Sequence, residues 1–257
     1  MSLRVSSRVL VALTLLVIVA GTVNFMEFQD YRQYIHRFLS SRRAALSFAD
    51  GLRQTSDDLT RMIRLYAVTG DPVYRDYFDE ILAIRNGESP RPVKYFEIPY
   101  WDIVLDTGVR LVEYGDAVPV RDLARDAGLY EDELALFVAA EDASNELAVL
   151  EVEVMDVVAA SIEAAGGDYV LEGDALAAAQ RLHGMDYHAA KAKVMEPLVE
   201  LDTRINTVLT AGHKEIVRRN NNYMANALGL VSLAALLILV GMWQRRRQQA
   251  RLQSTES

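Results

Sequence analysis

Residues 9–26 read VLVALTLLVIVAGTVNFM, and residues 224–243 read MANALGLVSLAALLILVGMW. Each stretch is close to the length that a helix needs to cross a bilayer, which is roughly 17 to 25 mainly apolar residues. The segment between them, residues 27–223, is polar and highly charged. This pattern predicts a domain that is anchored to a membrane at both ends by transmembrane helices.

Basic residues beside the two apolar stretches predict which side of the membrane the domain faces, because Lys and Arg near membrane ends stay cytoplasmic. The arginines in question are Arg4, Arg8, Arg245, Arg246, Arg247 and Arg251. We therefore expect residues 1–8 and the short tail 244–257 in the cytoplasm, and residues 27–223 in the periplasm of a bacterial inner membrane. Arg218 and Arg219 oppose this orientation, but a hairpin that follows both terminal signals has only one arrangement.

A cleaved signal peptide is the alternative interpretation of residues 9–26, since basic residues precede an apolar stretch. The small-x-small pattern of a cleavage site is poor here, because Ile18 stands two residues before Ala20. Apolar residues also continue in helical spacing past the membrane. An uncleaved anchor is therefore favoured.

The amino-acid composition limits which compartment and which binding partners are expected for this protein. The chain has no cysteine, which suits a periplasmic domain without disulfides. Of the 27 Lys and Arg, six lie outside residues 27–223, as does one of the 36 acidic residues, so this segment carries a net charge of −14. Such acidity argues against nucleic acid and anionic membrane surfaces as partners. It permits cationic or neutral ligands, and an anion held by a local Arg cluster.

Heptad spacing predicts a long helix over residues 30–68. Its main row of apolar or small residues is Tyr31, Phe38, Ala45, Leu52, Leu59 and Tyr66. Gly70 is expected to stop this helix, and the Asp-Pro pair at Asp71 and Pro72 to start the next one.

Further helices are predicted over residues 74–84, 100–111 and 130–165. A short helix is predicted after Asp174, which would be its N-cap. A last helix is predicted from Met185 into the second apolar stretch, with a kink at Pro197. Gly166 and Gly167 are expected to end the helix over 130–165. The proline-rich residues 73–129 form an irregular helical insert, expected at the membrane-distal end. The predicted fold class is all-α, an elongated, four-helix-bundle-like domain on two transmembrane helices.

Seven stretches of the chain are informative when taken together: residues 58–61, 66–72, 77–87, 90–92, 100–102, 186–191 and 195–197. They resemble the periplasmic sensory regions of bacterial transmembrane signalling proteins. The proteins that this chain resembles include methyl-accepting chemoreceptors, sensor histidine kinases and diguanylate or adenylate cyclases. The resemblance implies a signal-input role and does not indicate which output module belongs with it.

The chain departs from that pattern after residue 243. In those proteins the second membrane helix leads into a HAMP linker and an output module, whereas here an Arg-rich tail follows. An accessory sensor that acts through a partner, a truncated gene product and a fragment of a longer receptor are three competing explanations.

Six residues are candidates for ligand binding, either as cations for an anionic ligand or as aromatic pocket walls. They are Arg61, Arg64, Arg85, Arg91, Tyr100 and Trp101. Arg61 and Arg64 share a helix face and could hold a carboxylate; the alternative is pairing with Asp57, Asp58 or acids of another helix. For Arg85 and Arg91 the alternative is solvated surface. For Tyr100 and Trp101 it is anchoring of the insert to the core.

Metal binding and catalysis find little support in the sequence. His183 and His188 are five residues apart, which places them on different helix faces, and zinc spacings are absent; acid sensing by histidine is a further possibility. No phosphate loop, nucleophile elbow or metal triad occurs, and acids such as Glu151, Glu153 and Glu163 are expected to face solvent. We therefore expect neither an enzyme nor a cofactor.

The expected function is that of a ligand-sensing input module that passes a helix shift across the membrane to a cytoplasmic output module or partner protein. Its ligand would be a small molecule or a periplasmic protein. The alternative is a membrane-anchored interaction or scaffold protein without a small ligand. A homodimer is expected, because the heptads offer more apolar rows than one seam needs, and Gly229 lies on a small-residue face of the second membrane helix.

Overall fold

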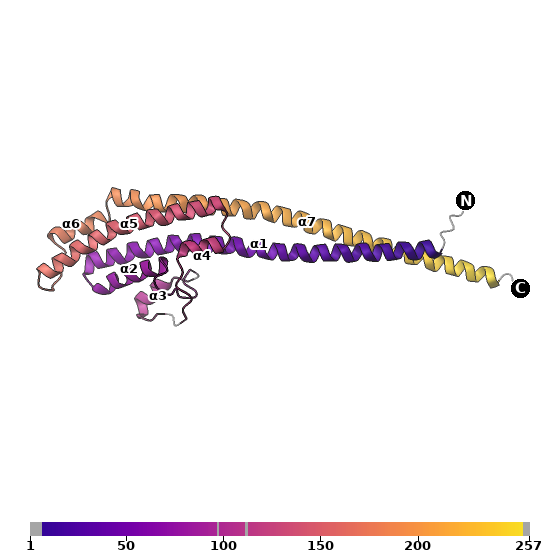
Figure 1. Ribbon diagram of the computed structural model, residues 1–257, viewed down its shortest axis with the longest axis horizontal. Helices are drawn as coiled ribbons and strands as arrows, with labels where there is room; N and C mark the ends of the chain where they lie inside the picture. The colour runs from indigo at the N-terminus through magenta and orange to yellow at the C-terminus, as the bar shows by residue number, and fades with distance from the viewer. Residues whose placement is uncertain (1–6, 97, 111–112, 254–257) are drawn as a thin grey trace. The chain divides into compact units, whose positions relative to one another are not determined.

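A computed structural model describes residues 7–96, 98–110 and 113–253 (Figure 1), and their regular structure is helical apart from one isolated bridge between Pro92 and Tyr114. The helices are α1 (Ser7–Thr69), α2 (Pro72–Arg85), α3 (Tyr100–Thr107), α4 (Val120–Asp126), α5 (Glu131–Ala164), α6 (Gly173–Arg181) and α7 (Met185–Gln253). The all-α prediction is confirmed. The chain forms two compact units: a terminal unit of residues 1–38 and 210–257, and a central unit of residues 39–209.

The predicted helices are present with shifted ends. α3 stops at Thr107, where Gly108 adopts the left-handed conformation, and residue 111 at its predicted end lies outside the described residues, as does Arg4. α6 takes Glu172 as N-cap, so Asp174 lies in its first turn instead of capping it. Helix α4 was not predicted, because the segment between Pro119 and Gly128 is too short to show a helical periodicity. α7 continues through Pro197, and the kink there stays a prediction.

The junction between α1 and α2 forms as its residues predict. Gly70 has φ of 70°, a left-handed conformation that favours glycine and ends α1 after Thr69. The Asp71 carboxylate accepts a hydrogen bond from the backbone N–H of Val73 at 3.0 Å, and Pro72 is the first helical residue. The chain thereby reverses within a few residues.

The core of the central unit contains the heptad positions of α1 that the sequence predicts. Ala45, Leu52, Leu59 and Tyr66 are buried, and they belong to one apolar cluster with side chains of the other helices of the unit. Burial of such side chains is the main stabilising term for helices of this kind. Within this unit α1, α5 and α7 lie side by side (Figure 1).

The insert is not confined to the far end of α1, because α2 turns back and the chain then follows α1. Phe96 packs so tightly against Gly51 that a Cβ at Gly51 would lie 2.3 Å from its ring. Further back along α1, the Ser41 hydroxyl donates to the Ala127 carbonyl at 2.9 Å. The insert therefore covers α1 from its end down to Ser41.

A buried ion pair fixes the start of α5 against α1. The Arg42 guanidinium and the Glu133 carboxylate lie 2.7 Å apart, and both side chains are almost fully buried. Arg42 also donates to the Gly128 carbonyl, while Glu133 accepts from the backbone N–H of Tyr130 at 2.8 Å. Each charge thus has a partner, which a buried ion requires.

In the terminal unit, both helices are long and apolar enough to cross a membrane. The mean hydropathy of their most apolar 18 residues is 2.4 for the first helix and 2.2 for the second. Almost none of these residues is buried within the protein. The two helices touch along this unit. Tyr223 lies beside Phe28 and Tyr31 with ring centroids 5.7 Å apart in both pairs, and a Cβ at Gly212 would meet the Phe38 ring at 2.6 Å. Aromatic side chains next to an apolar span are typical of membrane–water interfaces.

Candidate ligand-binding site

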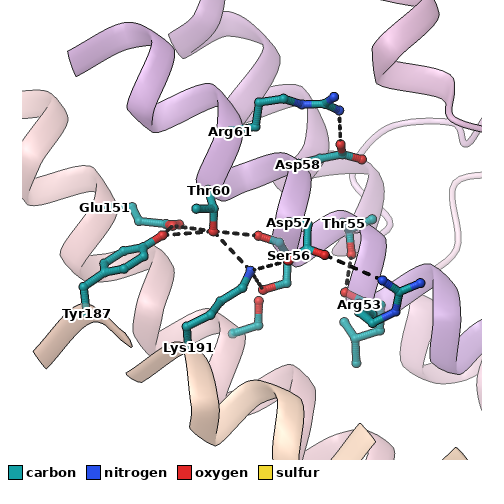
Figure 2. Close-up of polar contacts among 12 residues, drawn as sticks. Arg53, Thr55, Ser56, Asp57, Asp58, Thr60, Arg61, Glu151, Tyr187 and Lys191 are labelled. Carbon is teal, nitrogen blue, oxygen red and sulfur yellow. Dashed lines mark hydrogen bonds and ion pairs between the residues drawn. The ribbon is translucent and has the colours of Figure 1, made fainter. Parts of the chain in front are cut away.

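A closed polar cluster, which we call the polar core, joins three helices inside the central unit (Figure 2). α1 contributes Ser56 and Thr60, α5 contributes Glu151, and α7 contributes Tyr187 and Lys191. The Tyr187 hydroxyl lies 2.6 Å from Glu151 Oε1 and 2.9 Å from the Thr60 hydroxyl. The Lys191 ammonium donates to Ser56 Oγ at 2.8 Å and to Thr60 Oγ1 at 3.1 Å.

The burial of Glu151 corrects the prediction that the acids of α5 face solvent. Glu151 is 1% exposed, whereas Glu153 is exposed and pairs with Arg181 at 3.1 Å. Burial raises the pKa of Glu151 to about 7, against the lowering effect of its hydrogen bond from Tyr187 and the charge of Lys191. Polar partners from α1 and α7 make this burial possible, because they satisfy a carboxyl group that could not otherwise be buried.

Lys191 connects the polar core to the surface of α1. Its ammonium lies 3.0 Å from Asp57 Oδ1, and its side chain is 17% exposed while that of Asp57 is 52% exposed. Burial lowers the pKa of Lys191, and the neighbouring carboxylates of Asp57 and Glu151 oppose that shift. One lysine of α7 therefore contacts Ser56, Asp57 and Thr60 on α1.

A cleft of about 570 Å³, which we call the arginine cleft, opens beside the polar core. Its lining residues are Asp57, Thr60, Arg61, Arg64, Leu65, Val68, Thr69 and His183. The structure thus brings two of the predicted ligand residues, Arg61 and Arg64, into one concave site. A cleft of this size, with an apolar strip and a few polar groups, is typical of small-molecule sites.

Arg64 lies across the junction of α6 and α7. Its Nη2 donates to the Leu182 carbonyl at 2.9 Å, and its guanidinium stands 5.5 Å from the centroid of the Tyr187 ring. Because the Tyr187 hydroxyl belongs to the polar core, Arg64 links the arginine cleft to the same helix that carries Lys191.

Arg61 faces a second cleft of about 550 Å³, which we call the acidic cleft. It is lined by Asp50, Arg53, Gln54, Asp57, Asp58, Arg61, Phe96, Ile98, Pro99 and Asp102. Arg61 pairs with both Asp58 and Asp102, which joins α1 to α3. Asp58 is buried, and this burial raises its pKa to about 6 although Arg61 opposes the shift.

The other two arginine candidates lie elsewhere. Arg85 is 2% exposed and donates to the Ser144 hydroxyl at 2.8 Å and to Asn145 Oδ1 at 2.6 Å, so it joins α2 to α5. Arg91 lies in the loop after α2, with its guanidinium 5.2 Å from the centroid of the Phe96 ring. Desolvation lowers the pKa of both. Neither residue lines the two clefts.

Tyr100 and Trp101 are completely buried in the insert. Trp101 donates from Nε1 to the Tyr95 hydroxyl at 2.8 Å, and its ring lies 5.3 Å from that of Tyr77, centroid to centroid. Both side chains belong to the apolar core cluster, and neither lines either of the two clefts. These positions agree with the alternative considered for them, which is that they anchor the insert to the core.

The sequence prediction of the site missed Thr60, Glu151, Tyr187 and Lys191. A usable signal was present, because Ser56 and Thr60 on α1, and Tyr187 and Lys191 on α7, are two polar pairs four residues apart on otherwise apolar helix faces. Such pairs predict a buried polar contact between two helices.

Comparisons with protein-family models, with curated proteins and with solved structures gave no match. The assignment of a function therefore depends on the chemistry of the polar core and its two clefts.

Proposed function

We propose that the chain is the ligand-sensing input module of a bacterial transmembrane receptor. The central unit would lie in the periplasm and bind a small molecule or a periplasmic protein. α1 and α7 would cross the inner membrane with both termini in the cytoplasm, and the chain would act as a homodimer on an output module or partner protein. This proposal extends the finding that two helices of the chain are long and apolar enough to cross a membrane.

One observation carries the proposal: Lys191 of α7 pairs at 3.0 Å with Asp57, a residue that lines both clefts. A ligand that binds at Asp57, Arg61 or Arg64 changes the charges next to Lys191 and Tyr187. Both belong to the helix that continues into the second apolar stretch. A change in how α7 packs on α1 therefore has a continuous helical path to the membrane.

The energetics suit a switch with two states. Glu151, Lys191 and Tyr187 of the polar core are shielded from most of the solvent. In such surroundings, the loss of one hydrogen-bond partner costs about 1 to 3 kcal/mol of stability. Differences of this size are those by which ligands shift helix-packing equilibria. A ligand whose affinities for two packings of α7 differ by this amount would shift the equilibrium between them.

The test is a thermal-unfolding screen of the full-length protein, in detergent and in nanodiscs, against a library of small metabolites. Reproducible, concentration-dependent stabilisation by one chemical class is expected, because a ligand that binds only the folded state raises the unfolding temperature. A complete lack of response in both environments would instead favour the membrane-anchored scaffold.

A further inference from the structure

Arg64 is a half-buried cation without a counter-ion. Among the described residues no carboxylate lies within ion-pairing distance of its guanidinium, although acidic residues outnumber basic ones in this part of the chain. Its Nη2 donates to a backbone carbonyl, and its Nε, which is shielded from solvent, has no acceptor. Because Arg64 lines the arginine cleft, a ligand there can supply the carboxylate partner that the described residues do not.

The other ionised side chains that line the arginine cleft already have partners within the protein. Arg61 and the Asp57 carboxylate each pair with two groups of opposite charge. The lining itself contains two arginines, Arg61 and Arg64, and one carboxylate, Asp57, which is a formal excess of one positive charge. A ligand with one negative charge complements this excess, and Arg64 is the arginine of the lining that is left to pair with it.

The remaining lining residues indicate the shape of the ligand. Leu65 and Val68 offer an apolar strip on the last turns of α1, and Thr60 and Thr69 carry hydroxyl groups. His183, from the turn between α6 and α7, adds an imidazole to the lining. The volume of about 570 Å³ admits a small organic molecule with an apolar part as well as its charged group.

We propose that the arginine cleft binds a small organic carboxylate, whose carboxylate group pairs with the Arg64 guanidinium and whose carbon skeleton lies against Leu65 and Val68. Arginine is suited to this task because its planar donors match the two oxygens of a carboxylate. This inference names the ligand class of the proposed sensory function and rests on that function. Bound carboxylate would also change the field at Tyr187, which lies under Arg64.

The experiment is isothermal titration calorimetry of the full-length protein in nanodiscs. The probes are short monocarboxylates, dicarboxylates and α-amino acids, each compared with its uncharged amide, together with inorganic phosphate and a set of primary amines. At least one carboxylate is expected to bind, and its amide to bind about tenfold to a hundredfold more weakly, because the charged hydrogen bonds to Arg64 are lost. Binding of amines or phosphate alone would overturn the assignment, as would the absence of any binding.

Single substitutions in the arginine cleft test whether the carboxylate binds there. Arg64→Gln is expected to reduce carboxylate affinity by about tenfold or more, whereas Arg75→Gln, which removes a surface arginine paired with Asp156, leaves it unchanged. Val68→Phe serves as a second variant, because Val68 is exposed and a larger side chain there fills the cleft without entering the core. Unchanged affinity in Val68→Phe together with Arg64→Gln would overturn the proposal.

The outcomes separate this inference from the proposed function. If amines stabilise the protein and carboxylates do not, the sensory function stands and the ligand class is wrong. If carboxylates bind at Arg64 but the packing of α7 does not respond, the binding site stands and the signalling role is wrong.

Discussion

Lys191 of α7 and Asp57 of α1 form an ion pair of 3.0 Å between a mostly buried ammonium and a half-exposed carboxylate. The carboxylate lines both clefts, while the ammonium extends into the polar core. This pair is thus a direct contact between α7 and a side chain that lines both clefts.

Replacing the lysine tests how much this contact contributes. Lys191→Met keeps the length of the side chain but removes the ion pair and the hydrogen bonds to Ser56 and Thr60. We expect the free energy of unfolding to fall by about 1 to 3 kcal/mol, as for the loss of a charged hydrogen bond. Urea unfolding in detergent measures it. The matched control is Lys193→Met at an exposed position of the same helix, and equal effects of the two variants would contradict the role given to Lys191.

Glu151 predicts a particular dependence of stability on pH. Its folded-state pKa, about 7, lies above the ordinary value of 4.5, so the folded protein binds more protons than the unfolded chain between these values. Its contribution to stability is therefore full at low pH and is lost as pH rises through about 7, by up to about 3 kcal/mol. The groups facing Glu151 are Tyr187, Thr60, Lys191 and Arg85.

The Glu151→Gln variant imitates the protonated acid at every pH. It is expected to match the natural protein near pH 4, below the ordinary pKa of 4.5, and to be more stable near pH 8, when unfolding is followed by circular dichroism. Glu153→Gln, at an exposed position two residues away, is the control and should show no such divergence. A constant difference between Glu151→Gln and the natural protein across this pH range would show that Glu151 does not titrate in it.

Gly87 and Gly108 offer a matched test of how the insert packs. Both have positive φ, 75° and 66°, so alanine strains the backbone at either position by about 1 kcal/mol. A Cβ at Gly87 would also lie 2.4 Å from the backbone N of Pro119, whereas nothing lies within 4 Å of one at Gly108. We expect Gly87→Ala to destabilise the protein by about 1 to 3 kcal/mol more than Gly108→Ala in thermal unfolding. Equal losses would mean that the loop after α2 does not rest against Pro119.

The orientation of the chain in the membrane can be measured by labelling single introduced cysteines, because the natural chain has no cysteine. A cysteine at the exposed Glu88, in the loop after α2, should react with a membrane-impermeant maleimide in intact spheroplasts. A cysteine at Gln248, after the second apolar stretch, should react only once the membrane is permeabilised. The reverse pattern would contradict the proposed topology, and labelling of both before permeabilisation would show that the chain does not cross the membrane as a hairpin.

The sequence predicted the features that depend on local or periodic patterns. The heptads of α1 correctly placed Leu52, Leu59 and Tyr66 in the core, and the Gly-Asp-Pro sequence placed the end of α1 and the start of α2. These signals are contained within one helix or one turn.

Features that depend on contacts between distant helices could not be predicted in this way. The spacing of buried residues in α5 places Glu151 on the same helix face as Leu147 and Val154, and Glu153 outside that face. What cannot be predicted from α5 is that a carboxyl group is tolerated there, because its partners Thr60, Tyr187 and Lys191 lie on other helices. The same holds for Arg61 and Arg64, which are three residues apart on one helix. Only the structure shows that Arg61 pairs with two carboxylates while Arg64 has none within ion-pairing distance among the described residues.

Whether α7 carries a signal out of the central unit is measured by the rate of disulfide formation between cysteines at Phe38 and Gly212 in native membranes. These positions face each other on α1 and α7 within the terminal unit, and no other cysteine interferes. A carboxylate that binds at Arg64 is expected to change this rate at least about twofold in the otherwise natural protein, and not in the Lys191→Met background, because the link from the cleft to α7 is then removed. An identical rate with and without a ligand that calorimetry shows to be bound would contradict the account, since α7 would then carry no signal.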